Sequence, residues 1–130
     1  MAANCTSWIA IVTLYRRSRL ETGRPAEIWG VGSEIEFHPA WGIKALVPYL
    51  ESKRAFAQYA ARLSRDPSVV YRHIVLSSFR SRMGFGLMSA RTAVRIALFF
   101  LGRDWKYVPV TYTGFALLNY LRFRNLTHSQ

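Results

Sequence analysis

The sequence predicts a mainly α protein, a small set of amphipathic or apolar helices joined by extended segments, which on its own is not a self-sufficient globule. Apolar residues recur at helical spacing in several segments, and glycine and proline interrupt the chain between them. The helix predicted over 83–101 also has an arginine face and an apolar face, which neither lipid nor water alone accommodates. With 130 residues and one cysteine, the chain is predicted to be a single domain, 1–130, without a disulfide framework.

The N-terminal third is predicted to contain one helix followed by extended chain. Apolar residues recur at helical spacing from Trp8 to Tyr15, so we expect a helix over about 7–20. Glycine and proline interrupt the residues that follow, which predicts a loop or extended segment over 21–47. Within that segment, residues 31–38 alternate as they do in a short strand.

The remainder of the chain is predicted to be helical except for one segment. Pro48 fits the first turn of a helix, and Asp66 before Pro67 repeats a helix-start signal, a capping carboxylate followed by proline. The run from Val69 to Leu76 is rich in β-branched residues, so a strand is the alternative there. We expect helices over about 48–64, 67–82, 83–101 and 114–125, and extended chain over 105–113.

The charge balance indicates an anionic partner. The chain carries 18 Lys and Arg against 7 Asp and Glu, a net charge of +11, and 15 of the basic residues are Arg. The planar guanidinium binds carboxylate and phosphate through paired hydrogen bonds and stacks on aromatic rings. A coding bias toward arginine is the alternative explanation. The arginines expected to contact the anionic partner are Arg16, Arg17, Arg19, Arg80, Arg82, Arg91, Arg95, Arg122 and Arg124.

Glu34, Glu36 and His38 form a group that resembles a metal or proton-transfer site. Alternate residues of a strand project to one face, and carboxylates and imidazoles ligate metals or exchange protons. Three side chains on one strand do not enclose a metal without a further ligand, so we expect these residues to be structural and to pair with the surplus arginines. No metal, cofactor, catalytic residue or small-molecule substrate is predicted, and the protein is not expected to be an enzyme.

Two glycine pairs begin the pattern of a dinucleotide-binding turn. They are Gly30 with Gly32 and Gly84 with Gly86. The full pattern continues to a third glycine after a strand, and neither pair does so. We interpret these residues as turn or packing glycines.

The segment from Met83 to Gly102 is long enough to span a bilayer, but Arg91 and Arg95 lie in its middle. Each central arginine costs about 2.5–3.5 kcal/mol on membrane insertion. We therefore expect this helix to dock against partners that offer apolar contact on one side and anionic or carbonyl groups on the other.

The tripeptide Leu14-Tyr15-Arg16 resembles the signature of the LYR-motif family of mitochondrial accessory subunits and assembly factors. The resemblance covers three residues and implies a mitochondrial location, without the family's acyl-carrier binding. Glycine and proline interrupt the chain soon afterwards, where that family continues as a compact three-helix bundle.

These observations predict a noncatalytic accessory subunit of a large membrane-associated complex, a mitochondrial respiratory-chain complex or the ATP synthase. Its expected location is the mitochondrial inner membrane or its surface, and its expected partners are other protein subunits and anionic lipids. The alternative is a ribosomal protein, plausibly mitochondrial, that binds rRNA through basic residues interleaved with aromatic ones, as in the run from Tyr120 to Arg124.

Overall fold

The computed structural model describes residues 2–37, 42, 44, 47–77, 79–80 and 87–128, and the side chains from residue 6 onward in these ranges except those of Phe79 and Arg80. The described elements follow in the order α1 (Ala2–Glu21), β1 (Ala26–Ser33), the 3-10 helix η1 (Glu34–Phe37), α2 (Val47–Arg65), β2 (Val69–Leu76), β3 (Phe79–Arg80), β4 (Met88–Ser89), α3 (Ala90–Leu101), β5 (Tyr107–Val110) and α4 (Phe115–His128).

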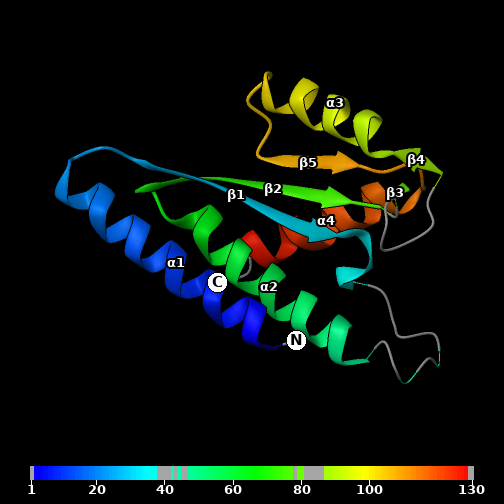
Figure 1. The fold of residues 1–130 in the computed structure, drawn as a ribbon, viewed down its shortest axis with the longest axis horizontal. Coiled ribbons are helices and arrows are strands. Elements are labelled where there is room, and N and C mark those ends of the chain that lie inside the picture. Colours follow the sequence, from blue (N-terminus) through cyan, green and yellow to red (C-terminus); the bar gives the residue numbers. More distant parts are fainter. Residues whose placement is uncertain are drawn as a thin grey trace.

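A parallel sheet organises the chain (Figure 1). Three strands lie in the order β1-β2-β5, and both neighbouring pairs are parallel. A second, two-stranded parallel pair joins β3 to β4. Helices α1, α2 and α4 lie on one side of the larger sheet and α3 lies on the other. The prediction of a mainly α set of helices is therefore wrong, because the structure is an α/β fold with helices on both faces of a parallel sheet.

The two crossover connections have opposite handedness. The chain moves across the sheet in the same direction from β1 to β2 and from β2 to β5. Helix α2, in the first connection, covers one face of the sheet, and α3, in the second, covers the other. Connections of this kind between parallel strands are right-handed in nearly all proteins. One of the two connections is thus of the rare left-handed kind.

Strand β2 replaces most of the helix that was predicted over 67–82. Asp66 does not cap a helix. Its carboxylate accepts hydrogen bonds from the backbone N–H and the hydroxyl of Ser68, which closes a tight turn into the strand. The strand is buried on both faces, so it lacks the regular alternation that would have marked it as a strand.

Strand β1 begins within residues that were predicted as a glycine-interrupted loop and ends in the first residues of the strand predicted over 31–38, of which 34–37 form η1 instead. Gly30 and Gly32 lie inside the strand, on its buried face. A Cβ atom at Gly30 would lie 1.9 Å from the Tyr71 hydroxyl oxygen, and one at Gly32 would lie 2.2 Å from Glu36 Oε1. These are packing glycines, and a larger residue at either position would displace a buried side chain.

The other helices lie close to their predicted ranges. Helix α1 begins earlier than the predicted 7–20, while α2 and α4 correspond to the predictions over 48–64 and 114–125. Helix α3 begins at Ala90, and residues 83–86 of the helix predicted over 83–101 lie outside the described residues. Among the helices that the structure describes, none combines the length and the apolar character needed to cross a membrane.

Candidate active site at the carboxyl edge of the sheet

The carboxyl ends of the strands mark the edge where parallel α/β sheets bind their ligands. Strand β1 ends there at Ser33, and η1 follows directly. Helix α2 connects β1 to the parallel strand β2, so it runs back along the sheet and its first turns lie at this same edge. It packs against both β1 and η1.

Tyr49 and Lys53 lie one turn apart in the N-terminal part of α2. Both side chains are half-buried, and Lys53 Nζ lies 5.6 Å from the centre of the Tyr49 ring. It also lies 5.8 Å from the centre of the Phe56 ring. Leu50, which is almost fully buried, anchors the same turn. The arrangement places a phenolic hydroxyl, a proton donor or acceptor, beside a fixed positive charge.

Ser33 contributes a hydroxyl at the end of β1, and a buried carboxylate holds its backbone. The Ser33 N–H donates a hydrogen bond of 2.8 Å to Glu36 Oε1. The other oxygen of Glu36 lies 3.1 Å from His73 Nε2. On the far side of the ring, His73 Nδ1 lies 3.1 Å from the Tyr71 hydroxyl. We call Glu36, His73 and Tyr71 the buried polar chain.

The buried polar chain supports the edge and does not itself face solvent. Glu36 and His73 are completely buried, and the ring of His73 stacks on Phe123 with 4.5 Å between the ring centres. Burial, with a further contribution from the Glu36 charge, raises the pKa of the Tyr71 hydroxyl, so this group stays protonated. Because Glu36 is buried and accepts the hydrogen bond from the Ser33 N–H, the buried polar chain holds the backbone of Ser33 in position.

The three residues singled out as a weak metal site are not brought together on one strand. Glu34 and Glu36 lie in η1, where Glu34 accepts a hydrogen bond from the Thr111 hydroxyl and Glu36 contacts His73 instead of an arginine. His38 lies outside the described residues. Within the ranges that the structure describes, no group of three or more His, Cys, Asp or Glu side chains is arranged to hold a metal ion.

Several of the arginines predicted to meet an anionic partner contact groups of this chain. Arg16 forms an ion pair with Asp66, and Arg122 donates a hydrogen bond of 2.7 Å to the Phe37 carbonyl. Arg17 pairs with Glu21, one turn away on α1, and Arg19 donates to the Pro25 carbonyl. Arg91, Arg95 and Arg124 are exposed, while Arg82 and the side chain of Arg80 lie outside the described part.

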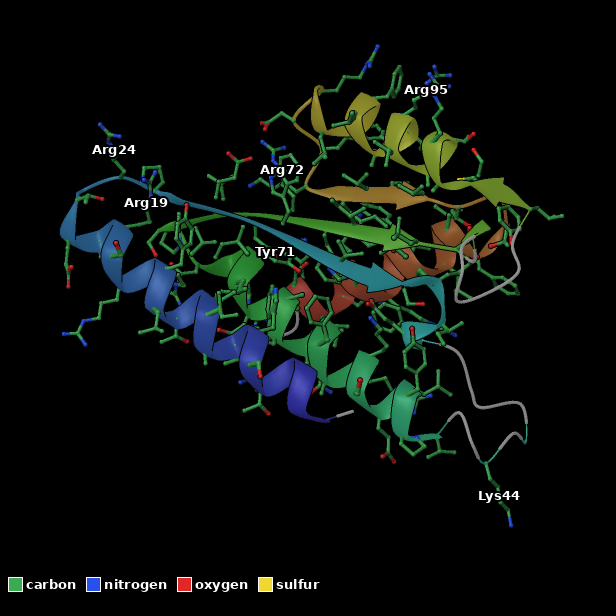
Figure 2. All side chains as sticks on the ribbon, in the orientation of Figure 1. Arg19, Arg24, Lys44, Tyr71, Arg72 and Arg95 are labelled. Atoms are coloured by element: carbon green, nitrogen blue, oxygen red, sulfur yellow. The ribbon has the colours of Figure 1, made fainter. Side chains whose placement is uncertain are left out.

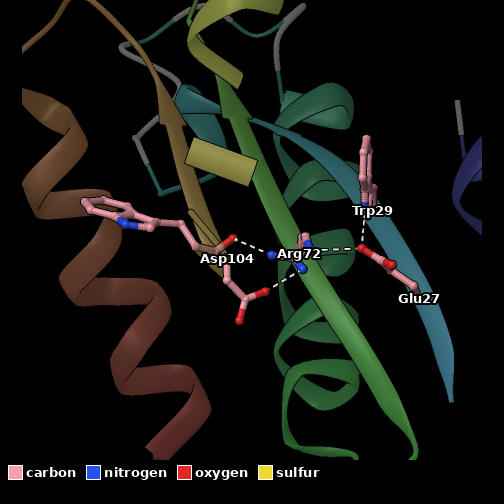
Figure 3. Close-up of polar contacts among 5 residues, drawn as sticks. Glu27, Trp29, Arg72 and Asp104 are labelled. Carbon is pink, nitrogen blue, oxygen red and sulfur yellow. Dashed lines mark hydrogen bonds and ion pairs between the residues drawn. The ribbon is translucent and has the colours of Figure 1, made fainter. Parts of the chain in front are cut away.

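Arg72 holds an ion-pair network with two carboxylates, which was not predicted from the sequence. Figure 2 shows Arg72 and Tyr71 on opposite faces of β2. Arg72 Nε lies 3.0 Å from Glu27 Oε1, and Nη2 lies 2.6 Å from Asp104 Oδ1 (Figure 3). The Trp29 N–H also donates to Glu27, and this bond, together with Arg72, lowers the pKa of that carboxyl. The network links β1, β2 and the segment before β5.

An open parallel sheet with helices on both faces and hydroxyl-bearing residues at its carboxyl edge defines a Rossmann-like α/β protein. Among solved structures, the chain is similar to the bulky-bulky ketone specific alcohol dehydrogenase from Comamonas testosteroni, with a TM-score of 0.58 and 16% identity. The similarity covers 88% of this chain and 47% of that chain, so this chain spans about half the length of the dehydrogenase. No family model and no curated protein matches the sequence.

This likeness overturns the prediction that the protein is not an enzyme. That prediction was based on the lack of a convergent set of catalytic side chains in the sequence, and the fold found is one that an enzyme uses. At 16% identity the likeness shows the fold alone, so the chemistry has to be argued from the residues at the edge.

Gly30 and Gly32 do not form the glycine turn by which Rossmann-like sheets hold a dinucleotide. Such a turn lies between a strand and the N-terminus of a helix. Gly30 and Gly32 lie within β1 instead, where the side chains of Tyr71, Glu36 and His73 fill the space beside them.

Ser33, Tyr49 and Lys53 were not singled out from the sequence. A tyrosine and a lysine four residues apart, directly after a helix-starting proline, are common on helix surfaces. The informative signal is their place after a strand that ends in serine. That signal requires β1 to be recognised as a strand, and its two glycines concealed it.

Proposed function

We propose that this chain supplies the proton-transfer site of an alcohol–ketone oxidoreductase. Tyr49 is the general acid or base that exchanges a proton with the oxygen of a ketone or secondary alcohol, and Lys53 and Ser33 assist it. The observation that carries the proposal is the Tyr49–Lys53 pair on the first turns of α2, at the carboxyl edge of a parallel sheet.

The roles follow from where charge develops. When a hydride adds to a ketone, the carbonyl oxygen becomes negative and must take up a proton, which the Tyr49 hydroxyl gives. Negative charge then develops on the Tyr49 oxygen, and the nearby Lys53 ammonium, together with the N-terminal end of α2, stabilises it. The Ser33 hydroxyl donates a hydrogen bond to the same substrate oxygen. The hydride comes from a reduced nicotinamide, which the assay below supplies.

The fold comparison supports the same chemical class. The alcohol dehydrogenase that shares this fold is described as specific for bulky ketones, and the similarity extends over most of this chain. An apolar ketone with two large substituents is accordingly the substrate class to test first.

The experiment measures ketone reduction by the protein, with benzil as the bulky ketone. The readout is the loss of absorbance of the reduced nicotinamide. Tyr49→Phe should lower kcat at least about 100-fold, the size of a lost general acid, without loss of folding. Lys53→Met should lower kcat by about tenfold or more. The matched control is Tyr59→Phe, because Tyr59 lies on the same helix but packs edge-on against Trp8.

Two results would contradict the proposal. One is a wild-type protein that reduces neither benzil nor smaller ketones. The other is a Tyr49→Phe variant that is as active as Tyr59→Phe. Membership of a membrane-associated or mitochondrial complex, and rRNA binding as its alternative, stay predictions of the sequence analysis.

A further inference from the structure

A cavity of about 870 Å³ opens on the side of the sheet that carries α2 and α4. It lies between the end of α2, the segment leading into β5, and one side of α4. Its apolar lining includes Tyr107, Pro109, Leu117, Tyr120 and Phe123. The volume is in the range of pockets that enclose a drug-sized organic molecule. Ser33, Tyr49 and Lys53 do not line it, so it is separate from the proposed active site.

Positive side chains surround this apolar lining. Arg65, Lys106, Arg124 and His128 line the cavity, and no Asp or Glu does. Arg65 donates a hydrogen bond of 2.8 Å to the Leu126 carbonyl, which fixes its guanidinium in place. Lys106 and Arg124 are exposed, and each can turn toward the opening. The cavity therefore combines apolar walls with a cationic rim.

The ring of Tyr107 lines the cavity, but its hydroxyl is buried and does not face the opening. The Tyr107 side chain is 7% exposed, and its oxygen has no partner among the described residues. Burial, and then the charges of Glu36 and Glu34, raise the pKa of this hydroxyl, which keeps it a donor.

We propose that this cavity binds a free single-chain amphipathic carboxylate, with its apolar chain against the aromatic lining and its charge neutralised by Arg124 and Lys106. Arginine pairs with carboxylates through two parallel hydrogen bonds, and the apolar walls remove the chain from water. The apolar walls and the acid-free cationic rim together indicate this kind of ligand.

Charge and shape distinguish this occupant from two others. A second copy of the chain would bring two cationic rims together, which is unfavourable without counter-ions. A membrane would meet the outer surface of the protein, whereas the apolar lining lies within a cavity of about 870 Å³, the size of a small organic molecule. A free organic anion fits both the cavity and the charges around it.

Isothermal titration with dodecanoate, kept below its micelle concentration, tests the proposal on the whole chain. Dodecanoate should bind, dodecanol should bind at least about tenfold more weakly, and dodecyltrimethylammonium should not bind. Arg124→Gln should weaken dodecanoate about tenfold and leave dodecanol unchanged, since it removes one charge-assisted contact.

Arg95→Gln is the matched control, because Arg95 is an exposed arginine of α3, on the other side of the sheet. It should leave dodecanoate affinity unchanged. Equal losses in Arg124→Gln and Arg95→Gln would show non-specific charge attraction and would overturn the proposal. So would no dodecanoate binding, preferential binding to anionic vesicles, or concentration-dependent dimerisation that Arg124→Gln abolishes. None of these results depends on the outcome of the ketone assay, since the cavity and the proposed active site share no residue.

Discussion

The two faces of the sheet are built from alternate residues of the same strands, yet their interiors differ in chemistry. The face under α1, α2 and α4 encloses the buried polar chain of Glu36, His73 and Tyr71 among aromatic rings. The face under α3 is aliphatic, formed around Ile74 and Val108 with their neighbours. Both interiors exclude water, but only the first depends on the direction of individual hydrogen bonds.

The difference shows how a fold tolerates ionisable groups in its core. A buried carboxylate, imidazole and phenol are each costly, and each has a partner at about 3 Å in the buried polar chain. Such a network accepts few alternative arrangements. The aliphatic face, in contrast, ends at a partly uncovered strand, where Trp29 and Val31 are each 50% exposed. We expect substitutions to be costly on the polar face and mild on the other.

The largest effect is expected for Glu36→Ala. The change removes the acceptor for the Ser33 N–H and the partner of His73 Nε2, and both groups remain buried without a replacement. We expect the free energy of unfolding to fall by about 3 kcal/mol or more, measured by denaturant titration. Glu36→Gln keeps an acceptor and a donor at the same places, so it should recover most of this loss.

Glu27→Ala is the control on the opposite face. Glu27 pairs with Arg72, but its side chain is 51% exposed, so its loss should cost less than about 1 kcal/mol. Similar losses in the two alanine variants would mean that the buried polar chain has no special weight in stability.

A smaller effect is expected for Gly32→Ala. The added methyl group would lie 2.2 Å from Glu36 Oε1 and 2.9 Å from His73 Cε1, so the buried polar chain has to shift. Overpacking of this kind costs about 1–3 kcal/mol, which thermal or denaturant unfolding would detect. Gly114→Ala provides the comparison, because a Cβ there meets nothing within 4 Å and the change should be close to neutral. A tolerated Gly32→Ala would show that the polar face repacks as easily as an aliphatic one.

Sequence patterns predicted the helices better than the sheet, for a physical reason. Helix α2 has one apolar side, and that periodicity is visible in the chain itself. Strand β2 is buried on both faces, so its apolar run from Val69 to Leu76 has no period that distinguishes it from a helix. In β1, the two glycines that suggest a loop are instead required by side chains from β2 and η1. That requirement arises only after the strands pair.

The candidate sites were predictable only in part. Glu36 was singled out from the sequence, but its contact, His73, lies 37 positions away and was read separately as a partly buried histidine. Tyr107 lay within a predicted extended segment, and nothing local marks its hydroxyl as unpartnered. Residues that act together at a sheet edge or around a cavity are distant in sequence, and the topology of the strands brings them together.

The smallest effect concerns a polar contact at the rim of the polar face, where Arg16 of α1 meets Asp66 before β2. The hydroxyl and N–H of Ser68, and then Arg16, lower the pKa of Asp66 below its ordinary value of 3.8. A carboxyl whose pKa is lower in the folded state stabilises the fold above its unfolded-state pKa, and this contribution disappears as the pH falls through the folded-state value.

Asp66→Asn keeps the acceptor for Ser68 and removes only the charge. We therefore expect Asp66→Asn to cost about 1 kcal/mol or less at pH 7, and the difference from wild type to disappear as the pH falls through the lowered folded-state pKa of Asp66, in paired denaturant titrations. Glu51→Gln, on the exposed side of α2, controls for the loss of one carboxylate. A difference that persists unchanged at low pH would contradict this expectation, because it would assign the Asp66 contribution to packing instead of charge.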